Sequence, residues 1–218
     1  MNGIKLVCFD LDETLIRGIH SVMYLCILNG KDDALRKIET REGQGELHWV
    51  ESDYHKARFI KGLDESKVPE RFDDILKPLK NIALVVNTLR QNGISSIVIT
   101  AGPKQVAKAA KEKWGFDASY GSDYEVVDGV FTGEILHHIG DTGKIACLED
   151  YCVKHGIQPS ECIAVGDGVS DMPLFAHCGT SIAINYSPLV LGKATHYLKT
   201  DDMHDVVDII LGQPRNGL

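Results

Sequence analysis

Short apolar runs that alternate with helical patterns constrain the fold of this chain more than any other feature of its sequence. Four of these runs have the length of a strand, at residues 4–9, 96–100, 162–165 and 181–184. A run that is apolar throughout is typical of a strand buried on both faces, as in a parallel sheet that helices cover. The sequence therefore predicts an α/β fold with a doubly wound, parallel-sheet core.

Helical patterns occupy the intervals between these runs, at residues 78–92, 103–114, 142–155 and 201–211. Pro78 and Pro103 suit the first turn of a helix, where a missing N–H group costs nothing. Between the second and third of these helices, Asp128-Gly129 stands between pairs of apolar residues. That dipeptide predicts the turn of a hairpin.

Residues 17–77 break the alternation. They are polar, charged and mostly helical in pattern, and they contain no convincing buried strand. We therefore expect residues 1–16 and 78–218 to form the α/β core. Residues 17–77 are expected to form a small helical cap inserted after the first strand.

The composition limits the partners of the protein. Its 218 residues, 44% hydrophobic and 25% charged, are typical of a soluble globular chain. The net charge of -8, without a cluster of Lys and Arg, argues against nucleic acid as a partner. No apolar run approaches the roughly 18 residues of a membrane helix, and the first residues lack the zones of a signal peptide. We expect a cytoplasmic protein that does not bind a membrane, with buried, reduced cysteines, as a monomer or a homodimer.

Two carboxylates directly follow the first apolar run. Asp10 and Asp12 are two residues apart, so in an extended segment their side chains point the same way. Open α/β sheets bind their ligands at this carboxyl end of the strands. Such a pair is costly unless a cation or a shared proton offsets the repulsion. The alternative is an acidic turn in which Asp12 or Thr14 caps a following helix.

A second acidic pair follows the apolar run at residues 162–165. Asp167 and Asp171 lie in the segment Gly-Asp-Gly-Val-Ser-Asp, although Asp171 also suits the cap of the next helix. If the two strands are neighbours, up to four carboxylates converge. Hard oxygen ligands with open positions suit Mg²⁺. The candidate metal site therefore comprises Asp10, Asp12, Asp167 and Asp171.

Two further places suit a phosphate group. Thr100 ends an apolar run, and Ala101 and Gly102 follow it at the start of a predicted helix. A hydroxyl group and free backbone N–H groups at a helix N-terminus can hold phosphate oxygens. Lys144 also stands near a helix start, where a cation is unfavourable to the helix dipole. An ammonium that faces phosphate would explain it, and a solvated lysine is the alternative.

Taken in this order along the chain, the four elements resemble the haloacid dehalogenase (HAD) superfamily. They are the DLDET segment at residues 10–14, the strand-ending Thr100, Lys144 and the GDGVSD segment at residues 166–171. Within the superfamily the sequence is most similar to phosphoserine phosphatase-type enzymes, which carry a helical cap between the first two motifs. The resemblance implies a Mg²⁺-dependent phosphatase that hydrolyses a small phosphate monoester.

The resemblance also implies a role for each matching residue. Asp10 would be the nucleophile that forms an aspartyl phosphate, and Asp12 the general acid and base. Asp10 and Asp167 would bind Mg²⁺ with the Asp12 carbonyl group, and Asp171 would lie behind them. Thr100, Lys144 and the Ala101–Gly102 segment would bind the transferred phosphoryl group.

The cap departs from the pattern of phosphoserine phosphatases. Ile19 stands where those enzymes carry a glutamate that holds the substrate amine. Lys56 falls where they carry an arginine for the substrate carboxylate, with Arg58 close by, although both also suit an ordinary charged helix face. Ser170 replaces their usual asparagine. Without an acid to pair an ammonium group, the site should bind phosphoserine poorly.

Other functions remain open on these motifs. A phosphomutase on the same scaffold would return the phosphoryl group to a sugar, and a carbon–halogen hydrolase would not need Asp12 as an acid. A signalling receiver module also places acidic residues, a Thr and a Lys around a phosphorylated Asp, but it is shorter and lacks the insertion. The adjacent His137 and His138 are expected to be solvated, and no histidine receives a catalytic role.

Overall fold

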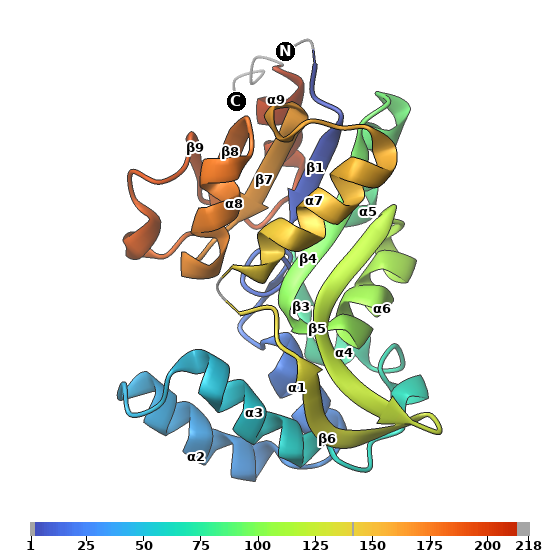
Figure 1. The fold of residues 1–218 in the computed structure, drawn as a ribbon, viewed down its shortest axis with the longest axis vertical. Helices are drawn as coiled ribbons and strands as arrows, with labels where there is room; N and C mark the ends of the chain where they lie inside the picture. The colour runs from blue at the N-terminus through green and yellow to red at the C-terminus, as the bar shows by residue number, and fades with distance from the viewer. Residues whose placement is uncertain (1–2, 141, 213–218) are drawn as a thin grey trace.

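A seven-stranded sheet forms the centre of the protein, in a computed structural model that describes residues 3–140 and 142–212 (Figure 1). The strand order is β6-β5-β4-β1-β7-β8-β9. Every neighbouring pair is parallel except β5 and β6, which are antiparallel. The predicted α/β fold with a doubly wound parallel sheet is confirmed. The strands are β1 (Leu6–Phe9), β4 (Ser95–Pro103), β5 (Ala118–Val127), β6 (Val130–His137), β7 (Cys162–Gly166), β8 (Thr180–Ile184) and β9 (His196–Leu198).

Strand β1 lies at the middle of the sheet and is buried along its whole length. Phe9, its last residue, is in register with Val98 of β4 and Val165 of β7. Because all three strands run in the same direction, their carboxyl ends meet at one edge of the sheet. The segments that follow them are therefore brought together there.

Helices cover both faces of the sheet, as the alternation of side chains along β1 requires. Val7 and Phe9 belong to one hydrophobic core, which includes residues of α5, α6 and α9. Leu6 and Cys8 belong to the other, with residues of α7 and α8. The helices are α5 (Ile82–Gln91), α6 (Lys104–Trp114), α7 (Gly143–His155), α8 (Met172–His177) and α9 (His204–Leu211).

Two helices begin later than the sequence predicts. Pro78 is not in the first turn of a helix, because it pairs with Ile16 in a two-stranded sheet of β2 (Ile16–Arg17) and β3 (Lys77–Pro78). Helix α5 begins only after Asn81, whose side chain donates to the Asp202 carboxylate. That contact holds Asp202 in the segment before α9, which begins at His204 instead of residue 201. Pro103, in contrast, directly precedes α6.

The helical insertion lies beneath the sheet in Figure 1. It comprises α1 (Ser21–Leu28), α2 (Asp32–Gly43), α3 (Trp49–Ile60), the 3₁₀ turn η1 (Glu65–Lys67) and α4 (Phe72–Ile75). Strands β2 and β3 pair where the chain enters and leaves this region. Their two-residue ladder closes the base of the insertion.

The β5–β6 hairpin reaches from the sheet to the insertion, which the sequence did not indicate (Figure 1). Its turn is the predicted one: Asp128 and Gly129 have positive φ angles of 50° and 80°, as a two-residue hairpin loop requires. Beyond the sheet, Phe131 of β6 exchanges backbone hydrogen bonds of 2.9 Å with Gly62 and Leu63. The hairpin therefore packs against the end of α3 as well as against the core.

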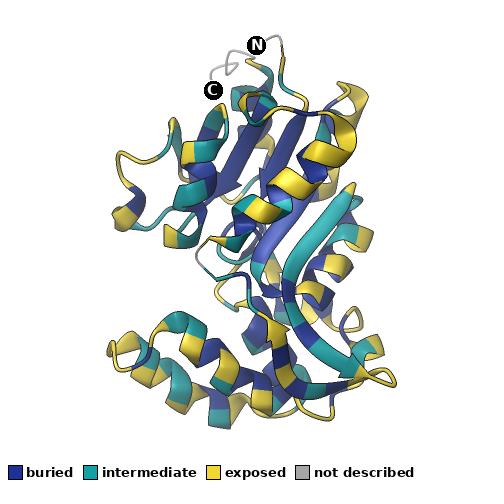
Figure 2. Ribbon diagram, in the orientation of Figure 1, coloured by how far each residue is buried: buried dark blue, intermediate teal, exposed yellow. Residues whose placement is uncertain are grey.

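Buried residues concentrate in the central strands and on the inward faces of the helices (Figure 2). All six cysteines are free thiols, as expected. Among the described residues, no helix is long and apolar enough to span a membrane.

Candidate active site

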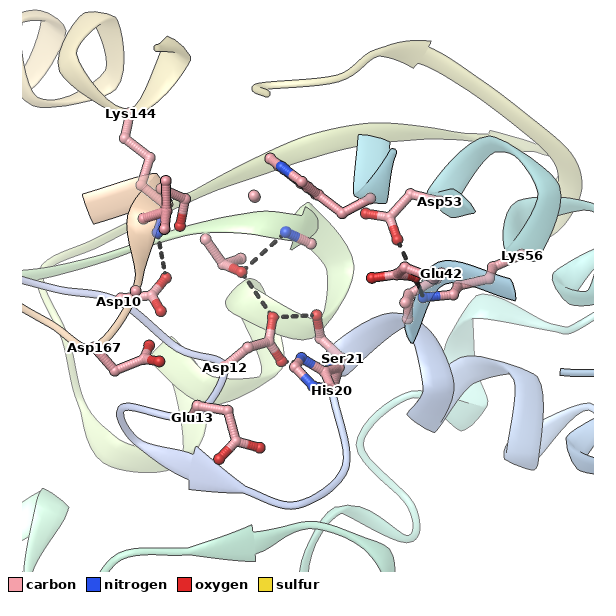
Figure 3. Close-up of a pocket in the computed structure, with 18 residues that line it drawn as sticks. Asp10, Asp12, Glu13, His20, Ser21, Glu42, Asp53, Lys56, Lys144 and Asp167 are labelled. Carbon is pink, nitrogen blue, oxygen red and sulfur yellow. Dashed lines mark hydrogen bonds and ion pairs between the residues drawn. The ribbon is translucent and has the colours of Figure 1, made fainter. Parts of the chain in front are cut away.

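A cavity of about 270 Å³ lies between the carboxyl edge of the sheet and the cap (Figure 3). Its core wall comes from the segments that follow β1 and β7, the end of β4 and the first turn of α7, and its cap wall comes from α2, α3, the start of α1 and the residue before α1. The core wall includes Asp10, Asp12, Glu13, Thr100, Ala101, Gly102, Lys144, Asp167, Gly168, Val169 and Ser170. The cap wall includes His20, Ser21, Val22, Glu42, Trp49, Asp53 and Lys56.

Lys144 is the centre of the core wall. Its Nζ donates to Asp10 Oδ1 and to Asp171 Oδ1, both at 2.6 Å. The side chain is 1% exposed, so the alternative of a solvated lysine is wrong. Its place in the first turn of α7 brings the ammonium group to the carboxyl end of β1. A buried cation there needs anionic partners, and the two carboxylates provide them.

Burial and repulsion from neighbouring carboxylates make Asp10 and Asp167 reluctant to ionise. Burial, followed by the Asp171 charge, raises the pKa of Asp10 well above its usual value, although Lys144 opposes the shift. The same two causes raise the pKa of Asp167 to about 7. Burial alone would lower the pKa of Lys144, but Asp10 and Asp171 together raise it. One ammonium group is therefore not enough positive charge for this cluster.

A bound cation would offset this excess of negative charge, and three of the carboxylates are close enough to hold one. Carboxylate oxygens of Asp10, Asp167 and Asp171 lie within 4.8 Å of one another. Thr14 Oγ1 joins two of them, because it lies 3.2 Å from Asp167 Oδ1 and 3.5 Å from Asp10 Oδ2. Hard oxygen donors in this number fit Mg²⁺, which takes one or two protein carboxylates and keeps several waters.

Asp171 organises the loop that carries Asp167. Its Oδ2 accepts from the backbone N–H groups of Asp167 and Gly168, each at 3.0 Å, while Oδ1 accepts from Lys144. Gly166 leaves room for this carboxylate, since a Cβ atom there would lie 2.3 Å from Asp171 Cγ. With both of its oxygens engaged in this way, Asp171 supports the segment that carries Asp167.

Asp12 turns away from this cluster and towards the cap. Its Oδ2 accepts from Ser21 Oγ at 2.7 Å and from Thr100 Oγ1 at 3.1 Å, and its Oδ1 accepts from the Ser21 N–H at 2.5 Å. The sequence analysis missed Ser21, the first residue of α1. The alternative expectation was that Asp12 caps a helix that follows it directly. Asp12 does accept from the first N–H of a helix, but that helix is α1, which begins nine residues later, and its first residues line the cavity.

The last residues of β4 leave little space, and the strand continues through Ala101 and Gly102 to Pro103. Gly102 donates its N–H to Thr100 Oγ1 at 3.0 Å. A Cβ atom on Gly102 would lie 2.0 Å from Ser21 Oγ and 3.1 Å from Asp12 Oδ2. Only glycine allows Thr100, Ser21 and Asp12 to approach each other this closely at the end of β4.

The two cap residues suggested by the sequence differ in position. Lys56 lines the cavity and is 5% exposed. Its Nζ lies 2.7 Å from Glu39, 2.8 Å from Glu42 and 3.8 Å from Asp53. Burial would lower the pKa of Lys56, but the hydrogen bonds that its ammonium group donates to Glu39 and Glu42 raise it. Arg58 is exposed and does not line the cavity, so the structure does not bring it to the candidate site.

The expectation of a solvated His138 is wrong. Its ring is 3% exposed, and Nε2 lies 3.1 Å from Asp53 Oδ2. Nδ1 accepts from the Gly140 N–H at 2.8 Å, which places the ring proton of a neutral imidazole on Nε2. The Trp49 ring lies 5.3 Å from the His138 ring, and Trp49 lines the cavity.

The sequence analysis missed the acids of the cap wall, Glu42 and Asp53. Glu42 is three residues after Glu39 on α2, and Asp53 is three residues before Lys56 on α3, so each pair shares a helix face. The spacing of these residues could be recognised in the sequence. Whether they face the cavity could not, because that depends on how α2 packs against α3.

The comparisons with known proteins agree with this geometry. The family model described as haloacid dehalogenase-like hydrolase matches residues 7–176. The chain therefore belongs to the haloacid dehalogenase-like hydrolase family, which confirms the resemblance drawn from its motifs.

Curated relatives include three proteins named phosphoserine phosphatase. The chain is 27% identical to the one from Archaeoglobus fulgidus over 94% of its own length and 60% of the relative's length. It is 29% identical to the one from Streptomyces coelicolor over 97% of its length and 51% of the relative's. The Halobacterium salinarum protein is also 29% identical, and the match covers 91% of this chain and 94% of that one. The chain thus spans only 51–60% of the length of the first two relatives.

Solved structures share the fold. A phosphoserine phosphatase in complex with substrate matches with a TM-score of 0.80 at 24% identity, over 96% of this chain and 99% of that one. A phospho-aspartyl intermediate analogue of phosphoserine phosphatase matches with a TM-score of 0.79 at 24% identity, over 95% and 99% of the two chains.

Proposed function

We propose that this protein is a Mg²⁺-dependent phosphatase that hydrolyses a small phosphate monoester through an aspartyl phosphate on Asp10. The observation that carries the proposal is the convergence of Asp10, Asp12, Thr100 and Lys144 on one cavity, beside a carboxylate cluster suited to a metal ion. Membership of a hydrolase family supports it. The proposed enzyme is cytoplasmic and acts as a monomer or a homodimer.

Mg²⁺ would be held by Asp10 and Asp167 with the Asp12 carbonyl group, and it would neutralise charge on the phosphate. Lys144 supplies a fixed positive charge on the same side of the cavity. Thr100, Ala101 and Gly102 line the same side of the cavity, and a phosphate bound there would take over the hydrogen bonds that the Thr100 hydroxyl and the Gly102 N–H now donate within the protein. These groups compensate the charge of the transferred phosphoryl group.

In the first step, a carboxylate oxygen of Asp10 attacks phosphorus and the bond to the leaving oxygen breaks. Asp12 gives its proton to that oxygen, so that the alcohol leaves neutral. In the second step, Asp12 takes a proton from water, and the water oxygen attacks the phosphorus of the aspartyl phosphate. Inorganic phosphate is released, and the Asp10 carboxylate is restored.

Ser21 and Thr100 are positioning residues for Asp12. Their hydroxyl groups both donate to Asp12 Oδ2, which fixes the carboxyl group beside the phosphate-binding end of β4. A general acid must lie within hydrogen-bond reach of the leaving oxygen. The contact from Ser21 makes this orientation depend on the cap, because Ser21 begins α1.

Phosphate release from an aryl phosphate such as p-nitrophenyl phosphate, with and without Mg²⁺, tests the proposal. The wild-type protein should turn over steadily with Mg²⁺, and Asp10→Asn should lose activity by at least about a thousandfold, because a carboxamide is not a nucleophile. Glu51→Gln, which changes an exposed carboxylate of α3, is the matched control and should retain activity. Unchanged turnover in Asp10→Asn would exclude the covalent mechanism.

The same assay separates the alternatives. A receiver module would take up phosphate once per molecule and stop. A phosphomutase would exchange the phosphoryl group between sugar positions in place of steady phosphate release.

A further inference from the structure

The cap wall of the cavity carries more negative than positive charge. Its buried cation, Lys56, is surrounded by the carboxylates of Glu39, Glu42 and Asp53. This cluster of three carboxylates and one ammonium group has two negative charges in excess, and two of its carboxylates, Glu42 and Asp53, line the cavity. His138 does not cancel them, since the proton assigned to Nε2 makes it a neutral donor to Asp53. The group that a substrate presents to this wall therefore meets an anionic surface.

Lys56 is not available to bind a substrate carboxylate. Its ammonium group lies at hydrogen-bonding distance from two acids, at 2.7 Å and 2.8 Å, and only 5% of the residue is exposed. A substrate carboxylate would have to displace Glu39 or Glu42 and would leave the displaced acid without its partner. Among the described residues that line the cavity there is no arginine, and the only other cap residue that can carry a positive charge is the exposed His20.

Glu42 and Asp53, in contrast, are placed to meet a cation. Both line the cavity, and their side chains are 30% and 11% exposed. In Figure 3 they lie with Lys56 on the side opposite Asp10, Lys144 and Asp167. Trp49 lines the same wall, and an indole face attracts ammonium groups. The sequence-based objection that no cap acid exists to pair an amine is therefore wrong.

We propose that the cavity takes a phosphate monoester of an amino alcohol, whose leaving group carries an ammonium group and no carboxylate. The inference rests on the proposed phosphatase function and adds the class of substrate. The phosphate group lies at Thr100, Lys144 and the metal site, and the ammonium group lies between Glu42 and Asp53. The cavity volume of about 270 Å³ suits a molecule of this small size, because it is below the range of roughly 300–1,000 Å³ for drug-sized ligands.

Three phosphate esters that differ in the charge of the leaving group test the inference. O-phosphoethanolamine carries the ammonium group alone, glycerol 3-phosphate carries no further charge, and O-phosphoserine carries both an ammonium group and a carboxylate. We expect kcat/KM with Mg²⁺ to decrease in that order, with roughly ten- to hundredfold between the first and the last. Equal or faster hydrolysis of O-phosphoserine or glycerol 3-phosphate overturns the inference.

The variant Glu42→Gln separates recognition from a structural role. It should lower the ratio of kcat/KM for O-phosphoethanolamine to that for O-phosphoserine by about tenfold or more, chiefly through KM. Removing one acid weakens the ammonium contact and also frees Lys56 for a carboxylate. A Glu42 that only supports the cap would lower both rates together and leave the ratio unchanged, which overturns the inference. Glu51→Gln, on the exposed side of α3, is the matched control and should leave the ratio unchanged.

Failure of this inference differs from failure of the proposed function. If p-nitrophenyl phosphate is hydrolysed and the three esters show no preference for the ammonium group, only the inference on substrate class is wrong. If the aryl phosphate and all three esters are inert with Mg²⁺, the phosphatase function is wrong and the inference falls with it.

Discussion

The two walls of the cavity are built in different ways. The core wall stands mainly on the carboxyl ends of three adjacent parallel strands, to which α7 adds Lys144, and Asp10, Lys144 and Asp171 are each at most 6% exposed. The cap wall stands on three helices of an insertion, and Glu42, its acid from α2, is about a third exposed. Backbone pairing in the sheet fixes the strand ends of the first set to one another. The second set depends on helix packing, so the chemistry is held more rigidly than the specificity.

The largest expected effect is on the core wall. Lys144→Met leaves the Asp10 and Asp171 carboxylates buried without their cation, which should destabilise the fold by about 3–5 kcal/mol and abolish turnover. Denaturant unfolding without metal measures the change. Lys154→Met, on the exposed side of the same helix, is the control and should cost less than about 1 kcal/mol. Equal losses in the two variants would show that the core wall does not depend on this buried cation.

Asp12→Asn should produce the next largest effect. Loss of a general acid lowers rates by about 10²–10⁴-fold, and the loss is greatest when the leaving group is a poor one. In this variant the rate of hydrolysis should therefore fall more for alkyl phosphates than for p-nitrophenyl phosphate, because the nitrophenolate can leave without a proton. An equal loss for both substrates would show that Asp12 does not protonate the leaving oxygen.

Binding of Mg²⁺ to the core wall should change the free energy of unfolding of the protein by an intermediate amount. At about 100 times its dissociation constant, Mg²⁺ should stabilise the wild-type protein by about 2.7 kcal/mol relative to protein in EDTA. Thermal unfolding measures this shift. Asp167→Asn should remove most of it, and a shift of the same size in that variant would contradict the assignment of Asp167 as a ligand.

The metal-free proteins should also differ in their dependence on pH. Burial raises the pKa of Asp167 to about 7 in the folded state, above its usual value of 3.8, so folding disfavours the ionised carboxyl group. The cost is absent below about pH 4, grows as pH rises towards 7, and is complete above it. Without metal, Asp167→Asn should therefore be more stable than the wild type at pH 8, by on the order of 1 kcal/mol, and the difference should vanish at pH 4.

The smallest expected effect is on the cap. Arg58→Ala should change kcat/KM by less than about twofold for any of the phosphate esters, because Arg58 is exposed and lies outside the cavity wall. Steady-state kinetics measure it. A large loss of kcat/KM would mean that the cap takes a different position over the substrate.

The difference between the core wall and the cap wall also explains which site residues could be predicted from the sequence. Asp10, Thr100 and Asp167 each follow an apolar run, and parallel strands bring such positions together whatever the rest of the chain does. Their meeting place was therefore predictable from local patterns. The contacts of Lys144 with Asp10 and Asp171 were less predictable, because Lys144 is on helix α7 and its position depends on how that helix packs on the sheet.

The cap could not be predicted to the same depth. The sequence pattern predicted its helices but not which side of each helix faces the cavity, because the orientation of α2 against α3 depends on packing between segments. Glu42 and His138 illustrate this. The first looks like a surface acid and the second like a loop histidine, yet one lines the cavity and the other is buried against Asp53.

The β5–β6 hairpin has a consequence for how the cavity opens. The cap is joined to the core at β2 and β3, and the hairpin provides a second attachment through the backbone hydrogen bonds between Phe131 and the chain after α3. Any movement of the cap away from the core therefore has to bend the β5–β6 ribbon or break the backbone hydrogen bonds of Phe131.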